Sequence, residues 1–379
     1  MQHAENLWVT RHRNHLHMSN LVGMRAAIVS YRLGGADGVS VTAGQWIRAL
    51  RRLGMRVRTV AGGGRPDVLV RSLALESRRP PSRRELERAL GDADLVVADN
   101  ICSLPMNRAV GEALADYLRG RPTVLRHHDL PWERPQYAHL ASWPPDDPAW
   151  WHVTINELAR HALADRRGIA ATTIYHGFAE RPHPEQRSDV RRRLKVTDGP
   201  LVLQPTRAIP RKGIDVGLAL TGALGGTYWL TGPAEDGYQA ELDALLDGSG
   251  VPYRRRLPFG VRMPAAYAAC DVVAMPSYWE GFGLPLIEAA LHRRPVAIGT
   301  FPVAQELARF GFHWFDACDP EPLRTHLADP DPALADHNEA IALAHFGIGA
   351  LARRLELLLS GAPMCAHSGG DAVCACLTA

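Results

Sequence analysis

One loop of the chain combines glycines, a proline and carboxylates in a pattern that suits a bound anion. It spans Trp279–Glu288 and follows the apolar run at residues 272–276, which reads as a buried strand. Gly281 and Gly283 allow the backbone to approach a ligand closely. Pro285 is typical of the first position of a helix, and the N–H groups at a helix start attract negative charge.

Two glutamates give this loop a second kind of binding group. Glu280 lies in the loop itself, and Glu288 lies about one turn into the expected helix. Carboxylates accept hydrogen bonds from hydroxyls, so the whole loop suits a ligand that carries both phosphate and sugar. The alternative is an ordinary strand-to-helix turn with solvated glutamates. A lone Gly-x-Gly favours that alternative, but the two flanking glutamates and Pro285 favour the ligand site.

A second loop supplies cations. Arg207 to Gly213 follows the apolar run that begins at Leu201, and it contains Arg207 and Lys212. Of the 43 basic residues, only Lys195 and Lys212 are lysines. A lysine in this loop therefore suggests that a compact ammonium is needed where a planar guanidinium does not fit. Such cations can neutralise a diphosphate leaving group as its charge develops.

A third constellation, Arg126–Trp132, follows another apolar run and contains His127, His128 and Asp129. A histidine at a strand end can hydrogen-bond a hydroxyl or a phosphate oxygen, and a histidine satisfied by loop backbone has equal weight. Trp132 belongs to a local group of four tryptophans. Because aromatic faces stack on sugar rings, we weigh an acceptor pocket here against loop packing, and we favour packing for most of the four.

These loops need parallel strands to position them. Arg25–Tyr31 reads as a strand, Gly34–Gly38 as a glycine turn, residues 39–53 as an amphipathic helix and Met55–Ala61 as the next strand. This is one βαβ unit of a parallel sheet. Further strands are expected at Leu95–Ala98, Thr123–Arg126, Val153–Ile155, Thr172–Tyr175, Leu201–Thr206, Thr227–Thr231, Asp271–Pro276 and Val296–Gly299.

The alternation of strands and helices is interrupted once, which predicts an α/β fold of two doubly wound domains facing each other across a cleft. The expected boundaries are a flexible N-terminal extension at 1–23, a first domain at 24–180, a linker at 181–199, a second domain at 200–345, a last helix at 346–360 and a disordered tail at 361–379.

Composition is that of an ordinary globular protein and excludes several classes. The chain has 379 residues, 46% of them hydrophobic, and a net charge of +3, which is too small to indicate nucleic-acid binding. No apolar run is long enough for a transmembrane helix, and the first residues lack the apolar core of a signal peptide. Six cysteines without regular spacing indicate reduced thiols and a cytoplasmic location.

The chain resembles glycosyltransferase family 4, retaining nucleotide-sugar-dependent enzymes whose GT-B architecture has two Rossmann-like halves. The resemblance covers about Met24 to Leu359. Glu280–Glu288 is similar to the family's Glu-seven-residues-Glu motif, and Arg207–Lys212 to its Arg…Lys-Gly motif. The turn Gly34–Gly38 resembles the first-domain loop near donor phosphate and acceptor.

The resemblance implies a role for each matching residue. The first domain would be the acceptor domain and the second the nucleotide-sugar domain, with the last helix returning to the first. Arg207 and Lys212 would hold the donor diphosphate. Glu288 would bind the ribose hydroxyls, and Glu280 would face the transferred sugar. The other implied donor-binding positions are Gly35, Gly281, Phe282, Gly283 and Leu284, and His128 looks like the family's cleft histidine, with His127 as its rival.

The implied activity is transfer of a hexose-type sugar from a nucleoside diphosphate to a hydroxyl acceptor, with retention and without a metal or other cofactor. The acceptor would be a small molecule, a glycan or a lipid-linked group, and His127, Asp129 and Trp132 are the candidates for its contacts. The leaving phosphate would take the acceptor's proton. Asp92-Ala93-Asp94 precedes its strand, at the wrong end for a ligand, and we interpret it as a turn.

Several alternatives stay open. A nucleotide-sugar 2-epimerase has the same two-domain architecture, and a non-catalytic sugar-nucleotide-binding subunit needs fewer of the four charged residues. Tyr175–Phe178 departs from the family's Asn-Gly-hydrophobic-Asp turn, which puts the subfamily in doubt. For the basic segment Arg78–Arg88 we favour a solvated loop over contact with anionic lipid. For Cys365, His367, Cys374 and Cys376 the spacing is poor zinc geometry.

Overall fold

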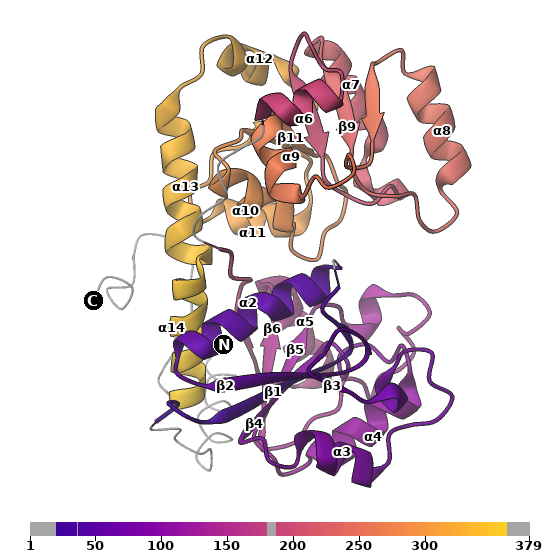
Figure 1. Cartoon of the computed structure of the whole chain (residues 1–379), viewed down its shortest axis with the longest axis vertical. Coiled ribbons are helices and arrows are strands. Elements are labelled where there is room, and N and C mark those ends of the chain that lie inside the picture. Colours follow the sequence, from indigo (N-terminus) through magenta and orange to yellow (C-terminus); the bar gives the residue numbers. More distant parts are fainter. Residues whose placement is uncertain (1–19, 36, 180–186, 362–379) are drawn as a thin grey trace. The chain divides into compact units, whose positions relative to one another are not determined.

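A computed structural model describes residues 20–35, 37–179 and 187–361 and divides the chain into two compact units. Unit 1 comprises Met1–Gly177 and Ile348–Ala379, and unit 2 comprises Phe178–Gly347. Each unit contains one parallel sheet with helices around it (Figure 1). The predicted fold class, two doubly wound α/β domains, is confirmed.

Unit 1 contains a seven-stranded sheet in the order β3-β2-β1-β4-β5-β6-β7, and every neighbouring pair is parallel. The strands are β1 (Arg25–Leu33), β2 (Arg56–Gly64), β3 (Val68–Leu69), β4 (Leu95–Asp99), β5 (Thr123–His127), β6 (Trp150–Thr154) and β7 (Ala171–Thr173). The helices are α2 (Gly38–Arg52), η2 (Arg71–Leu73), α3 (Arg83–Leu90), α4 (Arg108–Leu118), η3 (Pro131–Glu133), α5 (Glu157–Arg167) and α14 (Ile348–Ser360).

Alternate residues of β1 enter two different cores, because successive side chains of a strand point to opposite faces. Ala26 and Ile28 pack with α2 and α14, whereas Ala27 and Val29 pack with α3 and α4. Figure 1 shows α2 on one face of this sheet and α3 and α4 on the other. Burial on both faces explains why β1 reads as a continuous apolar run rather than an alternating one.

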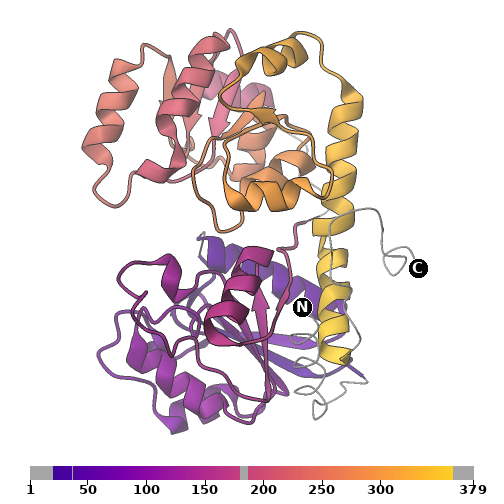
Figure 2. The ribbon, with the colours of Figure 1, turned by 180° about the vertical axis from the view of Figure 1, so that it is seen from behind.

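Unit 2 contains a six-stranded parallel sheet in the order β10-β9-β8-β11-β12-β13, and Figure 2 shows it from behind. The strands are β8 (Leu201–Gln204), β9 (Thr227–Leu230), β10 (Tyr253–Arg255), β11 (Val272–Met275), β12 (Val296–Ile298) and β13 (Phe315–Asp316). The helices are α6 (Arg187–Arg193), η4 (Pro210–Lys212), α7 (Ile214–Ala223), α8 (Gln239–Gly248), α9 (Met263–Ala269), α10 (Leu284–Leu291), α11 (Pro302–Ala308), α12 (Pro320–Ala328) and α13 (Pro332–Phe346).

The strand order creates one topological switch point in each sheet. In unit 2 the chain runs from β8 outward to β9 and β10 and then returns to β11 on the other side of β8. In unit 1 the corresponding pair is β1 and β4. Ligands of doubly wound sheets bind outside the carboxyl ends of the two strands that flank such a point.

Two expected boundaries differ from the structure. Leu21 is buried in the core beneath α2 and α14, so the packed unit begins before residue 24, while residues 1–19 lie outside the described residues. In the expected linker, residues 180–186 lie outside the described part, but α6 belongs to unit 2. Arg191 of this helix bonds Asp271 at 2.7 Å and Val190 is fully buried, so an arginine-rich segment is held by an ion pair as well as by apolar burial.

The basic segment 78–88 is also more ordered than the expected loop. Its second half forms α3, which begins at a capping box between Ser82 and Glu85. Arg79 pairs with Glu85 at 2.9 Å. Among the helices of the described residues, none has the length and apolar character to span a membrane. Residues 362–379 of the expected tail, which contain its cysteines and histidine, lie outside the described residues.

Candidate functional site

The Arg207–Gly213 loop and the Pro276–Gly283 loop follow β8 and β11, the two strands that flank the switch point of unit 2. The loops contact each other directly, because the Tyr278 N–H donates to the Arg211 carbonyl at 2.9 Å. Gly213 has φ +60°, and a Cβ there would lie 2.3 Å from the Pro276 carbonyl oxygen. Only glycine therefore allows this approach.

The two loops bring Lys212 and Glu280 together. Lys212 Nζ donates to Glu280 Oε1 at 2.5 Å, and their side chains are only 8% and 9% exposed. Ser277 Oγ donates to the same oxygen at 2.7 Å. Burial lowers the pKa of Lys212, and the carboxylate of Glu280 opposes this shift. The sequence singled out both partners but missed Ser277, which carries no signal beyond its place directly after a strand.

Two arginines of the same loop lie near this ion pair but form no close hydrogen bond with it. Arg211 Nη1 lies 3.9 Å from the second oxygen of Glu280. Arg207 is about half exposed, and its guanidinium pairs with Glu235 at 2.6 Å. The structure therefore joins Lys212 to Glu280 and directs the Arg207 side chain to a third residue. Arg211 was not among the predicted site residues, although it lies in the predicted loop.

Two helices begin at the site without a side-chain cap. α7 starts after Gly213 and α10 after Gly283, and both glycines have left-handed backbone conformations. A side-chain oxygen caps the starts of α2, α3, α4, α5, α12 and α13, whereas α8, α9 and α11 also start without one. A helix start without a side-chain cap can direct its N–H groups to an anion.

Four more residues of the Pro276–Gly283 loop and the start of α10 were predicted to bind the donor, and they can do so mainly through their backbone. Phe282 is buried, and its ring packs on Phe178 and Phe346 with centroids 6.5 and 6.2 Å apart. Its side chain belongs to the core, so only its backbone can face a ligand. Gly281, Gly283 and Leu284 lie between Glu280 and the first turn of α10.

Glu288 lies one turn into α10 and is held by a residue that the sequence did not suggest. Its Oε2 accepts a hydrogen bond from the Tyr267 hydroxyl at 2.6 Å. The Tyr267 ring stacks on His292, with centroids 5.1 Å apart. Burial raises the pKa of Glu288, and the Tyr267 hydroxyl lowers it. Tyr267 thus fixes the direction of the carboxylate.

In unit 1, the glycine turn follows β1 at the switch point of that sheet. Gly34 has φ +77°, and a Cβ on Gly35 would lie 2.7 Å from Asp37 Oδ2. Asp37 caps α2 by accepting from the Ser40 N–H at 3.0 Å. The turn therefore leads directly into a capped helix.

The two candidate histidines at the end of β5 have different surroundings. His127 is 1% exposed, and its ring contacts Ser103 Oγ at 2.8 Å and His152 Nδ1 at 2.9 Å. His128 is less buried, and its Nε2 contacts Asp99 Oδ1 at 2.8 Å. The backbone N–H of His128 donates to Asn100 Oδ1 at 3.1 Å. His127 thus belongs to the interior, and His128 is the one with access to solvent.

Asp99, the last residue of β4, is a second residue that the sequence did not suggest. It is fully buried, and burial would raise its pKa, but Arg126 and His128 outweigh this and lower it. Arg126 Nη1 lies 3.2 Å from the carboxylate, and its guanidinium also lies over the Trp46 ring, 4.8 Å from the centroid. Asp99 therefore stays ionised and orients the His128 imidazole.

The other two candidate acceptor residues, Asp129 and Trp132, pair or pack with residues of unit 1. Asp129 pairs with Arg134 at 3.0 Å. Trp132 packs on the small core around Leu130, and Arg166 lies 5.4 Å from its ring centroid. The expectation that most tryptophans of this group are packing residues agrees with the burial of Trp143, Trp150 and Trp151.

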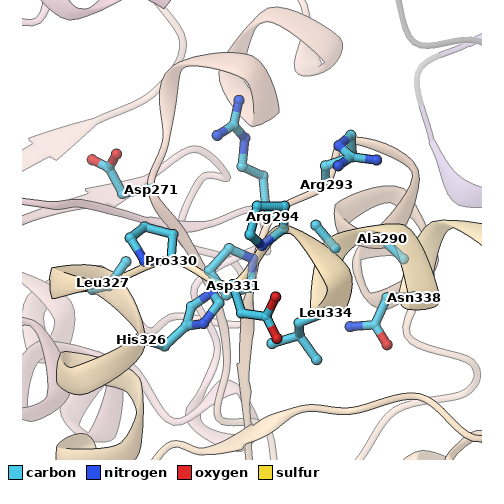
Figure 3. Close-up of a pocket in the computed structure, with 13 residues that line it drawn as sticks. Asp271, Ala290, Arg293, Arg294, His326, Leu327, Pro330, Asp331, Leu334 and Asn338 are labelled. Atoms are coloured by element: carbon cyan, nitrogen blue, oxygen red, sulfur yellow. The ribbon is translucent and has the colours of Figure 1, made fainter.

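Two further features carry no ligand chemistry. Asp92 and Asp94 lie before β4, where they bond Arg58 and Arg25. A cavity of about 230 Å³ lies at the amino ends of β11 and β12, between α10, α12 and α13 (Figure 3). Three of its charged lining residues are already paired: Arg294 donates to the carbonyls of Tyr267 and Ala268, Arg293 pairs with Glu339, and Asp271 pairs with Arg191.

Two doubly wound sheets, with charged loops at the switch point of one, define the GT-B fold. The sequence model described as "Glycosyl transferases group 1" matches residues 218–328, which include Glu280 and Glu288 but not Arg207 and Lys212. The chain is 27% identical to a mannosylglucosylglycerate synthase of Thermotoga maritima over 349 residues, which covers 74% of this chain and 81% of the relative. It is 24% identical to the enzyme of that name from Petrotoga mobilis, with 76% and 85% covered.

Solved structures show the same fold. HepE from Anabaena, in complex with UDP-glucose, matches with a TM-score of 0.72 at 22% identity, covering 89% of this chain and 100% of that one. Sucrose-phosphate synthase from Thermosynechococcus elongatus matches with a TM-score of 0.64 at 18% identity, covering 88% and 98%. Together, these comparisons support a glycosyltransferase of the GT-B fold.

Proposed function

We propose that this chain is a retaining glycosyltransferase of family 4 that transfers a hexose-type sugar from a nucleoside diphosphate to a hydroxyl acceptor. The observation that carries the proposal is the buried Lys212–Glu280 pair, which lies at the switch point of unit 2 beside two helix starts without side-chain caps. A cation and helix N–H groups suit a diphosphate, and a nearby carboxylate suits a sugar hydroxyl.

In the proposed reaction, the bond between the anomeric carbon and the phosphate oxygen breaks as the acceptor oxygen bonds to the same face of that carbon. The leaving phosphate oxygen takes the acceptor's proton. Lys212 and Arg207 stabilise the charge that the diphosphate gains in the transition state. Arg207 must exchange Glu235 for the phosphate, which its half-exposed position permits.

The other roles follow the family resemblance. Glu288 binds the ribose hydroxyls, with Tyr267 fixing its direction. Glu280 and the backbone of Gly281–Leu284 face the transferred sugar. In the same reaction, His128 has the role of the family's cleft histidine, and the turn that contains Gly35 contributes to donor binding.

No metal takes part in the proposal, because the cationic side chains and helix starts supply the positive charge. The structural relative is described with UDP-glucose, which makes UDP-glucose the first donor to test. The curated relatives are named for a product of mannose, glucose and glycerate, so a nucleoside diphosphate mannose with glucosylglycerate as acceptor is the second pair to test.

The test is calorimetry with nucleoside, nucleoside diphosphate and nucleotide sugar on two variants. Lys212→Ala should weaken binding of the diphosphate by about tenfold or more, since a hydrogen bond to a charged group contributes about 1.5–3 kcal/mol. It should leave nucleoside binding unchanged. Glu288→Ala should weaken nucleoside and nucleotide alike, because both carry the ribose.

If Lys212→Ala binds the diphosphate as tightly as the wild type, the assignment of the phosphate site is wrong. Turnover measured in excess chelator should persist, and its loss with restoration by manganese or magnesium would contradict metal independence. Epimerisation of the donor without any acceptor would favour the 2-epimerase alternative, and binding without turnover would favour a non-catalytic subunit.

A further inference from the structure

A buried glutamine lies directly beneath the predicted phosphate loop. Gln204 is the last residue of β8, and it is 0% exposed. Its Nε2 donates to the carbonyl of Lys212 at 2.8 Å. Its Oε1 accepts from the hydroxyl of Tyr228, on the neighbouring strand β9, at 2.8 Å.

The direction of these two hydrogen bonds explains why an amide stands at this position. The Tyr228 hydroxyl donates to the amide oxygen, and the amide N–H donates onward to the Lys212 carbonyl. Neither a carboxylate nor an apolar side chain provides both an acceptor and a donor. In a buried site, consecutive hydrogen bonds of this kind polarise and strengthen each other.

The first turn of α7 is shaped to admit this amide. A Cβ on Gly217 would lie 2.4 Å from Gln204 Oε1 and 3.1 Å from Tyr228 Cε2. Glycine at this helical position costs about 1 kcal/mol relative to alanine. The missing side chain therefore makes room for the Tyr228–Gln204 hydrogen bond.

The backbone that Gln204 holds belongs to the residue that supplies the buried ammonium. Lys212 ends the short helix η4, and its Nζ contacts Glu280 at 2.5 Å. Since a lysine side chain has four rotatable bonds, the position of its ammonium depends on a fixed Cα as well as on Glu280. Groups that bind charge lose affinity when their supporting residues allow them to shift.

We propose that Gln204, oriented by Tyr228, is a positioning residue. It holds the backbone of Lys212 so that the Lys212 ammonium is placed to bind the diphosphate of the donor. This inference rests on the proposed function, which gives Lys212 its phosphate. It adds a residue outside both charged loops, and it assigns to Gly217 the role of leaving space for the amide.

The principal variant is Gln204→Met, which keeps the size of the side chain and removes these two hydrogen bonds together with a longer one, at 3.5 Å, from Gln204 Nε2 to Thr206 Oγ1. Calorimetry should show diphosphate affinity falling by about tenfold, with nucleoside affinity within about twofold of the wild type. The turnover number should fall as well. A purely structural role would lower the melting temperature without changing the ratio of the two affinities.

Gln204→Glu gives a conservative rescue that depends on pH. The ionised carboxylate has no hydrogen to donate to the Lys212 carbonyl, whereas the protonated carboxyl has one. Because burial favours the protonated form, diphosphate affinity relative to wild type should recover as pH is lowered from 8 to 6. Should Gln204→Met fail to fold, this recovery carries the test alone, and its absence overturns the proposal.

Thr221→Val is the matched control. Thr221 is buried on α7 and its hydroxyl donates to the Gly217 carbonyl at 2.7 Å, and within the described part of the chain it forms no hydrogen bond with Lys212. It should lower stability while leaving the affinity ratio unchanged. If Lys212→Ala loses the diphosphate and Gln204→Met retains it, this inference is wrong and the proposed function stands. If Lys212→Ala also retains it, the proposed function itself is wrong.

Discussion

The two histidines at the end of β5 are adjacent in sequence, yet the residues around them give them different chemistry. Burial, followed by the nearby His152 and His128, lowers the pKa of His127 well below 6.5, so that ring stays neutral and internal. His128 is held at its Nε2 by Asp99, and its Nδ1 makes no hydrogen bond within the described part of the chain. A fixed ring with one available nitrogen suits the substrate contact that we propose for His128.

This difference predicts opposite effects for two neighbouring substitutions. His128→Gln should reduce turnover by about tenfold or more, since it removes an oriented hydrogen bond, with little change in melting temperature. His127→Gln should lower the melting temperature and keep most of the turnover. Steady-state kinetics and thermal melts of both variants check this. The reverse pattern would make His127 the functional histidine.

The residue types in the loops were enough to predict part of the site from the sequence. The other site residues became visible only in the structure, because they come from segments that are distant in the sequence. Lys212 and Glu280 stand out in the sequence because a rare lysine and a Gly-x-Gly loop each follow an apolar run. The residues that hold Lys212 and Glu288 do not stand out. Gln204 and Tyr267 lie in ordinary apolar segments, and only the register of β8 with β9 and the packing of α9 on α10 reveal what they bond.

At the scale of elements, length and apolar periodicity decided which strands and helices were predictable. The buried central strands appear as apolar runs in the sequence. β3, β10 and β13, which were not predicted, have two or three residues each, and none of these residues is buried, so they carry no buried apolar run. α13 has only three buried residues among fifteen, Asn338, Ala342 and Phe346, and one of them is polar, so its buried face gives a weak apolar signal.

The start of unit 1 gives a prediction at this scale. Leu21 is 8% exposed and packs in the core beneath α2 and α14, and the Gly23 N–H donates to the Gly54 carbonyl at 2.9 Å. A chain that starts at Met24 loses both. We expect unit 1 to lose about 2–5 kcal/mol of unfolding free energy, as for other large-to-small changes in a core.

Denaturant unfolding of chains that start at Asn20 and at Met24 measures this loss. Leu21→Ala in the full chain isolates the side chain from the backbone contacts, and it should account for most of the difference. Equal midpoints for the two shortened chains would show that residues 20–23 add nothing to the stability of the unit.

At the scale of the whole molecule, the chain forms two units with separate cores and passes between them at residues 177–178 and 347–348. The two units distribute their charged groups differently. In unit 2 the buried ion pair lies in the candidate site. In unit 1 a buried network of histidines, Asp99 and Arg126 lies at the carboxyl ends of β4 and β5. We therefore expect the two units to respond differently to acid.

The buried histidines of unit 1 determine whether the stability of this unit rises or falls as the pH is lowered. Burial lowers the pKa of His127 and of His176 well below 6.5. Between the lowered pKa and 6.5, the unfolded chain binds a proton at each histidine and the folded chain does not. Stability therefore falls as pH falls below 6.5, by up to about 1.4 kcal/mol per pH unit for each histidine. Glu133, whose pKa burial raises to about 7, titrates in the opposite direction and offsets about one of them.

A substitution isolates one histidine from the rest. The groups that face His127 are Ser103, His152 and His128, with Asp146 beyond His152. His127→Gln keeps hydrogen-bonding capacity and removes the titration, so its unfolding free energy should fall less steeply than that of the wild type as pH is lowered from 6.5 to 5. Denaturant unfolding at several pH values measures the two slopes.

His161→Gln, at an exposed position on α5, is the control and should follow the wild type. Parallel slopes for His127→Gln and the wild type would show that His127 binds its proton in the folded chain.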